Sequence, residues 1–255
     1  RLSNALRKCI TLRLDGNYKF GLLLSGGLDS RAVLAASNNR DIVTFSFGHD
    51  ETNLEVEVAK KIAKIKNQKN LFLKIPDYNL DRIDTAINSG NGMFNFIHAP
   101  TLPFSSIIRE NCDILLHGWA PEIPFRGLDL PRKELHFFGK KLRIQSLEVI
   151  SEKRLPYLIL TKPKYSNHHR NPKQLFNNHK DFDTLLLNSI KSFLDEIEEK
   201  NLYNKYDYVI NGYLFRYPSF LNVSSLRSYI DERTFMFDND LFDLYLEITP
   251  ELRLG

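Results

Sequence analysis

Short apolar runs alternate with helical patterns over the first 131 residues of the chain. Phe20–Leu24 is a continuous apolar run, and Ile42–Phe47 is rich in β-branched and aromatic side chains. Leu71–Ile75 and Ile114–Leu116 are two further short segments of this kind, and we expect all four to be strands. Strands that alternate with helices predict an α/β fold. Because these strands are almost wholly apolar, we expect a parallel sheet with helices on both faces.

Helical periodicity accounts for much of the remaining sequence. Apolar residues recur at helical spacing over residues 54–65, and Thr52 and Glu55 fit a capping box at the start of that helix. The chain reads as helical from about residue 140, with a clear apolar stripe over residues 182–197. We therefore expect an α/β region over residues 1–135 and a mainly helical C-terminal extension over residues 136–255.

Composition excludes several classes of protein. A chain of 255 residues with 42% hydrophobic and 26% charged residues can bury a core, which argues against disorder. Two cysteines rule out a disulfide scaffold, and no Cys or His cluster has zinc spacing. The net charge of +4 is too small to indicate nucleic acid as a partner, and no apolar run is long enough to span a membrane. The chain starts at Arg1 without an apolar leader, so we expect a piece of a longer cytoplasmic protein.

The most informative segment is SGGLDS at Ser25–Ser30, which directly follows the first predicted strand and opens a helix. Phosphates bind in such places because the free N–H groups and the dipole of a helix N-terminus favour an anion. Gly26 and Gly27 lack Cβ atoms, so the backbone can turn tightly and approach a ligand. The two serine hydroxyls add hydrogen-bond donors.

Asp29 narrows the choice of ligand for this segment. A carboxylate beside a phosphate repels it unless a cation bridges the two, and Mg²⁺ favours a combination of carboxylate and phosphate oxygens. A Walker A loop would instead carry GxxxxGK[ST], and this chain has none. The segment therefore predicts a site for a metal-bound pyrophosphate.

This string resembles the pyrophosphate loop, SGGxDS, of the N-type ATP pyrophosphatases, which have an adenine nucleotide alpha hydrolase-like fold. Three further segments narrow the resemblance: TFSFG at Thr44–Gly48, ERTFMFDNDL at Glu232–Leu241 and PELR at Pro250–Arg253. Together they are similar to the synthetase domain of the glutamine-dependent asparagine synthases over nearly the whole chain. That family carries Arg-x-Pro-Phe-Leu-Asp near its C-terminus, which Met236 and Phe237 match imperfectly.

The resemblance implies a two-step reaction with ATP and Mg²⁺. A carboxylate, aspartate or a related acid, is activated as an acyl-adenylate, and ammonia or an amine then attacks to give an amide and AMP. The implied ATP-binding residues are Leu23, Leu24, Ser25, Gly26, Gly27, Asp29, Ser30, Phe47, Gly48, His117 and Gly118. Asp29 and Glu122 are the implied metal ligands, and Asp29, Glu122 and Arg233 the implied catalytic residues. The implied source of ammonia is a glutaminase domain in the full-length chain or a separate subunit.

One segment departs from the family pattern. The family has Gly-Glu-Gly-Ser-Asp-Glu after a later strand, whereas this chain has GWAPE at 118–122. Gly118 matches the first glycine, Trp119 stands in place of the first glutamate, and Glu122 is the one acid that remains. The change leaves two alternatives open: an adenylating enzyme for a different carboxylate or a nucleic acid, and a non-catalytic ATP-binding domain.

Three residues have two interpretations each, and Cys9 is left unassigned. Arg31 either reaches a phosphate or an acidic substrate, or is a solvated first-turn arginine. Arg233 either binds a substrate carboxylate or pairs with a nearby acid as scaffold, and we favour the first. For His117 we favour a backbone contact with the nucleotide over a catalytic imidazole. Cys9 lies within a predicted helix, away from the start of the chain, so we do not assign it as a nucleophile.

Overall fold

The computed structural model describes residues 1–38, 40–76, 83–89, 99–118, 127, 130–161, 182–216 and 224–254. The chain forms two compact units. The first unit comprises Arg1–Pro121 and Leu214–Tyr245, and the second comprises Glu122–Tyr213 and Leu246–Gly255. Residues 214–245 therefore belong to the same unit as the strands of the first half. The sequence pattern does not indicate that this late segment joins the first unit.

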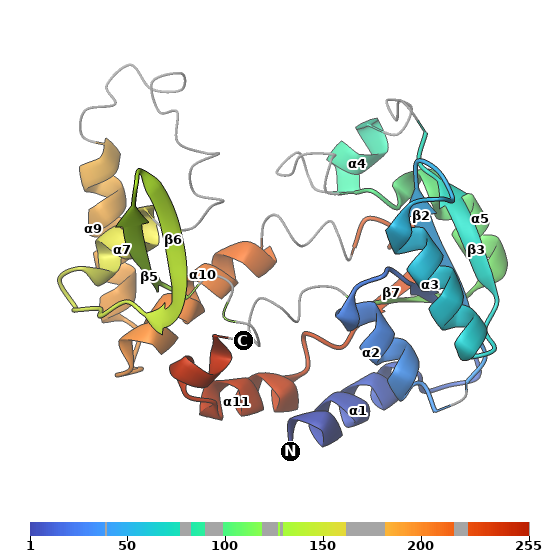
Figure 1. Ribbon diagram of the computed structural model, residues 1–255, viewed down its shortest axis with the longest axis horizontal. Coiled ribbons are helices and arrows are strands. Elements are labelled where there is room, and N and C mark those ends of the chain that lie inside the picture. The colour runs from blue at the N-terminus through green and yellow to red at the C-terminus, as the bar shows by residue number, and fades with distance from the viewer. Residues whose placement is uncertain are drawn as a thin grey trace. The chain divides into compact units, whose positions relative to one another are not determined.

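A five-stranded parallel sheet forms the centre of the first unit (Figure 1). In spatial order its strands are β3 (Asn70–Lys74), β2 (Ile42–Gly48), β1 (Phe20–Leu23), β4 (Ile114–His117) and β7 (Asp231–Thr234). The first four confirm the strands predicted from the sequence. The chain passes from β1 to β2 on one side, while β4 and β7 lie on the other. The strand order thus reverses at β1, which is where open α/β sheets bind their ligands.

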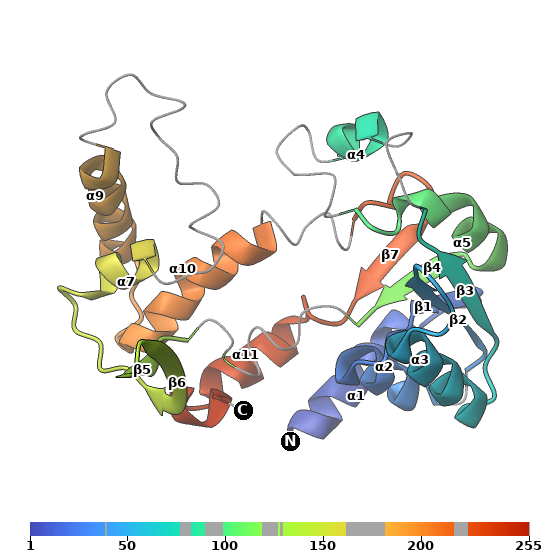
Figure 2. The ribbon, with the colours of Figure 1, turned by 45° about the horizontal axis from the view of Figure 1, so that its top comes forward.

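Helices cover both faces of this sheet, as the sequence predicts. Those of the first unit are α1 (Leu2–Arg13), α2 (Leu28–Ala36), α3 (Leu54–Ile65), α4 (Ile83–Ser89), the short η3 (Leu102–Phe104), α5 (Ser105–Asn111) and most of α11 (Asn239–Glu247). Figure 2 shows α1, α2 and α3 on one side of the sheet and α5 on the other. The predicted α/β architecture is therefore confirmed.

A cluster of buried apolar side chains fills the space between the sheet and α5. Phe45 on β2, Leu115 on β4 and Ile108 on α5 have no exposed surface, and Leu226, which precedes β7, joins them. Side chains two residues apart on a strand point to the same face. Phe47 and His117 therefore share this face, one step nearer the carboxyl ends of their strands.

The start of α3 differs from the predicted capping box. Asn53 is the N-cap, and its side-chain oxygen accepts a hydrogen bond of 2.9 Å from the backbone N–H of Glu55. The Thr52 hydroxyl instead donates to Asp50, 2.6 Å away. Asparagine is as strong an N-cap residue as threonine and stands one position nearer the helix, so it takes the capping position.

The second unit contains an antiparallel hairpin as well as helices. Its elements are β5 (Arg132–Phe137), β6 (Lys140–Leu147), α7 (Leu155–Thr161), α9 (Phe182–Asp195), α10 (Leu202–Arg216) and η6 (Pro250–Arg253). Residues 140–147 form a strand, so the expectation of helix from residue 140 is wrong for this segment. The two-residue turn at Phe138 and Gly139 has positive φ at both positions, +45° and +71°, which suits a tight hairpin. Over the described residues, no helix is long and apolar enough to cross a membrane.

Arg253 is the central polar group of the second unit. Its guanidinium is 1% exposed, and its Nη1 donates to Asp207 Oδ2 at 2.9 Å. Nη2 donates to the Asn204 side chain at 2.8 Å and Nε to the carbonyl of Ile248 at 2.7 Å. A buried charge of this kind is tolerated only with such partners, because water is not there to solvate it. The arginine thus ties η6 to α10.

We expect Asp207→Ala to destabilise the second unit by about 3–5 kcal/mol, because it leaves the Arg253 guanidinium buried without its counter-ion. Glu57→Ala is the matched control, since it removes an exposed ion pair with Lys61 and should cost less than about 0.5 kcal/mol. Urea unfolding and hydrogen exchange of α10 measure the difference. Equal effects of the two substitutions would contradict a central role for Arg253.

Candidate functional site

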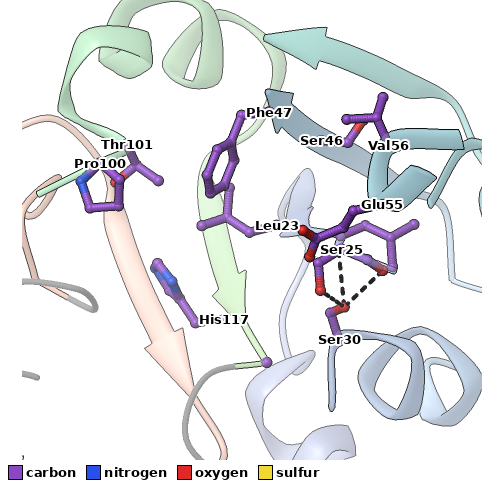
Figure 3. A pocket seen from close by; sticks show the side chains of 12 residues that line it. Leu23, Ser25, Ser30, Ser46, Phe47, Glu55, Val56, Pro100, Thr101 and His117 are labelled. Atoms are coloured by element: carbon purple, nitrogen blue, oxygen red, sulfur yellow. Dashed lines mark hydrogen bonds between the residues drawn. The ribbon is translucent and has the colours of Figure 1, made fainter. Parts of the chain in front are cut away.

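The segment between β1 and α2 is closed by its two serines. The Ser25 backbone N–H donates to Ser30 Oγ at 3.1 Å, and the two hydroxyl oxygens lie 3.1 Å apart (Figure 3). Ser25 Oγ also accepts a hydrogen bond from the backbone N–H of Gly27 at 3.1 Å. The serines, which the sequence assigns as phosphate donors, hold the two ends of the turn together in this structure. The turn is therefore shaped before any ligand arrives.

The start of α2 has the features of an anion site. Gly27 is its N-cap, in an extended conformation, and no side chain caps the helix. The N–H groups of the first turn have no partner within the helix, and the positive end of the dipole lies here. Asp29 lies in this first turn. Arg31 Nε donates to the carbonyl of Gly27 at 2.9 Å, so this side chain supports the turn.

Gly118 lies against the same turn from the end of β4. A Cβ added at this residue would lie 2.5 Å from Ser30 Cα and 2.6 Å from Ser30 N. These are backbone atoms that cannot swing aside, so only glycine allows β4 to approach α2 this closely. Packing against α2 therefore accounts for the glycine that the sequence analysis assigns to nucleotide contact.

A cavity of about 220 Å³ opens at the carboxyl ends of β1, β2 and β4. Of the residues predicted to bind ATP, it is lined by Leu23, Leu24, Ser25, Ser30, Phe47, His117 and Gly118. Gly26, Gly27, Asp29 and Gly48 are not part of its lining. The cavity is also lined by residues that were not predicted from the sequence: Ser46, Glu55, Val56, Pro100 and Thr101. Of these five residues, only Glu55 could have been found from the sequence, because it is a polar residue in the first turn of the helix after β2.

Glu232 is a buried acid that the sequence analysis did not single out as a binding or catalytic residue. Its Oε1 lies 2.9 Å from His117 Nε2, and its Oε2 accepts the backbone N–H of Leu226 at 2.8 Å. The side chains of His117 and Glu232 are 3% and 0% exposed. The register partner of Glu232 on β4 is Leu115, which belongs to the cluster beneath α5. The carboxylate of Glu232 therefore points to the same face of the sheet as that cluster. The pair joins β4 to β7 at the edge of the cavity.

Arg233 lies on the opposite face of β7. Its Nε donates to Asp231 at 3.0 Å, and its Nη1 donates to the carbonyl of Arg13 on α1 at 3.1 Å. It lines a second cavity of about 320 Å³, which contains none of Ser25–Ser30. Neighbouring strand residues point to opposite faces, so the contacts of Arg233 differ from those of Glu232, although both residues line this second cavity. The structure does not bring Arg233 together with the residues of the first cavity.

Asp238, from the same C-terminal motif, pairs with Arg13. Burial raises the pKa of Asp238, but hydrogen bonds from the Cys9 thiol and the Arg13 guanidinium outweigh it and hold the pKa below the ordinary 3.8. Burial and the hydrogen bond to Asp238 raise the pKa of Cys9 to about 12. A thiol with that pKa is protonated at neutral pH, so Cys9 is a buried structural residue rather than a nucleophile.

The predicted metal ligands are described only in part. Glu122 and its neighbour Trp119 lie outside the described residues. Within the described ranges, no group of three or more His, Cys, Asp or Glu side chains forms a metal site. Mg²⁺ does not need one, since it is held by one or two carboxylates together with phosphate oxygens and water. Asp29, next to the uncapped helix N-terminus, fits such a site.

Comparisons with known proteins place the chain beside a protein family and a solved structure. The sequence profile of the family described as asparagine synthase matches residues 1–254. A solved structure of NMN synthetase from Francisella tularensis matches with 12% sequence identity and a TM-score of 0.39, over 86% of this chain and 96% of that chain. A comparison with curated proteins finds no match.

We expect Gly118→Ala to cost about 1–3 kcal/mol and to weaken ATP binding, because the new methyl group pushes the first turn of α2 out of place. Gly212→Ala on α10 is the matched control, since nothing lies within 4 Å of its added Cβ and it should stabilise the helix by about 0.5–1 kcal/mol. Calorimetric ATP titration and thermal unfolding measure both variants. Unchanged ATP affinity in Gly118→Ala would contradict the link between β4 and the turn.

We expect the stability advantage of the wild type over Asp238→Asn to disappear in acid. The folded-state pKa of Asp238 is depressed, so its contribution is present above the ordinary value of 3.8 and is lost as the pH falls through the lower folded-state value. Urea unfolding at a series of pH values measures it. The control is Asp231→Asn, whose carboxylate is half exposed and should matter little at any pH.

Proposed function

Because the chain belongs to the asparagine synthase family, we propose that it is an ATP-dependent ligase that forms an amide. In this proposal a carboxylic acid, aspartate or a related acid, is activated as an acyl-adenylate and then transferred to ammonia or an amine. The observation that carries the proposal is the serine-closed turn at the uncapped start of α2, which opens on a cavity at the carboxyl edge of the sheet.

The two ends of the cavity suit the two ends of ATP. The first turn of α2 offers N–H groups and a positive dipole to the β- and γ-phosphates, beside Ser25 and Ser30. Leu23 and Phe47, at the carboxyl ends of β1 and β2, form an apolar wall for the adenine ring. Phe47 is 37% exposed, so part of its ring is accessible to a stacked base. The α-phosphate would then lie between these two ends.

The chemistry follows from that placement. An oxygen of the acid attacks the α-phosphorus, and pyrophosphate leaves from the turn at α2. The amine nitrogen then attacks the acyl carbon, and AMP leaves. Such transfers need little from protein side chains beyond holding the reactants in line and neutralising charge, which the turn and the helix dipole do.

Asp29 and Glu122 are the residues that we propose hold Mg²⁺ with the pyrophosphate. When bound, the ion neutralises negative charge that builds up on the leaving phosphates. Without a cation, an ionised Asp29 in the first turn of α2 would oppose the anion that the helix dipole attracts. We therefore expect ATP binding to depend on a divalent cation.

A second candidate function is a non-catalytic ATP-binding domain. The observation in its favour is Trp119, which stands where the family has a glutamate. The same substitution is compatible with an active enzyme that takes a different acid or amine. The intact SGGLDS segment favours the enzyme, because it keeps every fixed residue of the family's pyrophosphate loop, from which pyrophosphate leaves in the proposed reaction.

The partners of the proposed enzyme are small molecules: the acid, ATP, and ammonia or an amine. We propose that ammonia comes from a glutaminase, fused or separate, as the family implies. A net charge of +4 gives no support to a nucleic-acid substrate. The proposed location is the cytoplasm, where ATP and amino acids are available.

We expect the wild-type protein to catalyse ATP–pyrophosphate exchange when the correct acid is present. The measurement is the incorporation of labelled pyrophosphate into ATP with aspartate and then a panel of other carboxylic acids. Exchange that depends on one acid would show that an adenylate forms and would identify that acid. Asp29→Asn should reduce the exchange by at least about 100-fold, because it removes the carboxylate proposed to hold the metal.

Asp84→Asn is the matched control, since Asp84 lies in the first turn of another helix, α4, and is not part of the cavity. It should leave the exchange unchanged. ATP binding that requires Mg²⁺ but supports no exchange with any acid would contradict the ligase and favour the non-catalytic domain.

A further inference from the structure

The buried pair of His117 and Glu232 has no role in the steps described above. His117 is the last residue of β4 and lines the cavity, whereas Glu232 lies behind it on β7. We propose that His117 accepts the proton that the attacking amine must lose, and that Glu232 holds its ring for that purpose. The inference rests on the proposed function, because it assigns a residue to the second step of that reaction.

The hydrogen bonds of the pair fix which ring nitrogen is available. An ionised carboxylate can only accept hydrogen bonds, and Glu232 accepts from the Leu226 N–H with one oxygen and from His117 with the other. Nε2 of His117 therefore carries a proton, and in the neutral ring Nδ1 is an acceptor. A carboxylate behind the ring selects this tautomer and stabilises the imidazolium that forms, as in other acid–histidine pairs.

The imidazole ring of His117 lies on the side of the cavity from which we expect the amine to approach. Figure 3 shows it on the side of Pro100 and Thr101, across the cavity from Ser25, Ser30 and Glu55. The next residue, Gly118, lies against the backbone of Ser30 in the first turn of α2. With pyrophosphate at that turn and adenine at Phe47, the α-phosphate and the acyl group bonded to it lie on the side that β4 lines. An amine that attacks the acyl carbon thus approaches past His117.

The charges around the ring do not oppose a proton on it. Glu232 on β7 contacts it, Glu55 on α3 faces it across the cavity, and Asp29 lies in the first turn of α2. Among the described residues that line the cavity there is no lysine or arginine. Asp231 and Arg233 point to the other face of β7. The charged side chains that contact the ring or line the cavity with it, Glu232 and Glu55, are therefore both acidic.

In the proposed second step, the amine gives one proton to His117. The lone pair of the amine nitrogen forms the C–N bond, and the bond between the acyl carbon and the phosphate oxygen breaks, so that AMP leaves with the electron pair. The nitrogen is then positively charged and gives one proton to Nδ1 of His117, which later passes it to water. Proton transfer of this kind to a positioned base contributes about 10²–10⁴-fold to a rate.

The two half-reactions separate this role from a structural one. His117→Gln keeps a side-chain N–H for Glu232 but cannot take up a proton. With the acid that supports exchange in the wild type, ATP–pyrophosphate exchange should persist in this variant, while amide formation from ammonium chloride falls by about 100-fold or more. Hydroxylamine is a stronger nucleophile, and after attack its nitrogen is more acidic than that of ammonia and gives its proton to water more readily, so formation of the hydroxamate should be largely retained.

Three further variants test the pair and its surroundings. Glu232→Gln should lower amide formation less than His117→Gln does and should shift its pH profile, because the ring keeps its place but loses the charge behind it. Ser225→Ala removes a different buried hydrogen bond, to Thr101, and should leave both half-reactions unchanged. Added imidazole should restore amide formation in His117→Ala.

Three outcomes would overturn the inference. Amide formation in His117→Gln at the wild-type rate at every pH would show that His117 is not the base, while the proposed ligase would stand. Equal loss of exchange and amide formation would show that the pair only ties β4 to β7. An absence of acid-dependent exchange in the wild type would overturn the proposed function, and this inference with it.

Discussion

The site depends on one close contact, between Gly118 at the end of β4 and the backbone of Ser30 in α2. It leaves no room for a Cβ, so the strand and the helix start are held at a fixed separation. The hydrogen bonds of Ser25 and Ser30 then close the turn between β1 and α2 above it. Because β1 is the strand where the order of the sheet reverses, the closed turn lies at the mouth of the cavity. A ligand therefore meets a turn whose shape is already set, which lowers the entropic cost of binding.

Alternation along β7 distributes the C-terminal motif between two faces of the sheet. Glu232 points to the face of the α5 cluster and meets His117, whereas Arg233 points to α1 and contacts the carbonyl of Arg13. Asp238, after the strand, pairs with Arg13 as well. One short segment thus supplies a carboxylate behind the first cavity and a scaffold on the other face. Family resemblance alone does not distinguish these roles, because it assigns the motif as a whole.

The features that the sequence predicts are those set by local pattern. Four strands, α3 and the SGGLDS turn are encoded in contiguous residues, and all were found. β7 was missed because its sequence, DERT, is polar, and it becomes a strand only by pairing with β4. The burial of Glu232 and Arg253 could not be foreseen, since charged side chains are buried only where distant residues supply partners. Glu122 lies outside the described residues, so its assignment as a metal ligand stays a prediction.

The proposed formation of an amide also requires a group that accepts a proton. A neutral amine becomes cationic when it attacks, so a group on the protein or the solvent must take a proton before the neutral amide is formed. The described lining has two titratable side chains, Glu55 and His117. Glu55 lies beside the turn proposed to hold the phosphates, where its carboxylate is separated from the acyl carbon by the anion itself. His117 lies on the other side of the cavity, and its Nε2 contacts the buried carboxylate of Glu232. His117, supplied by β4 and held by Glu232 of β7, is therefore the residue that we propose for proton transfer.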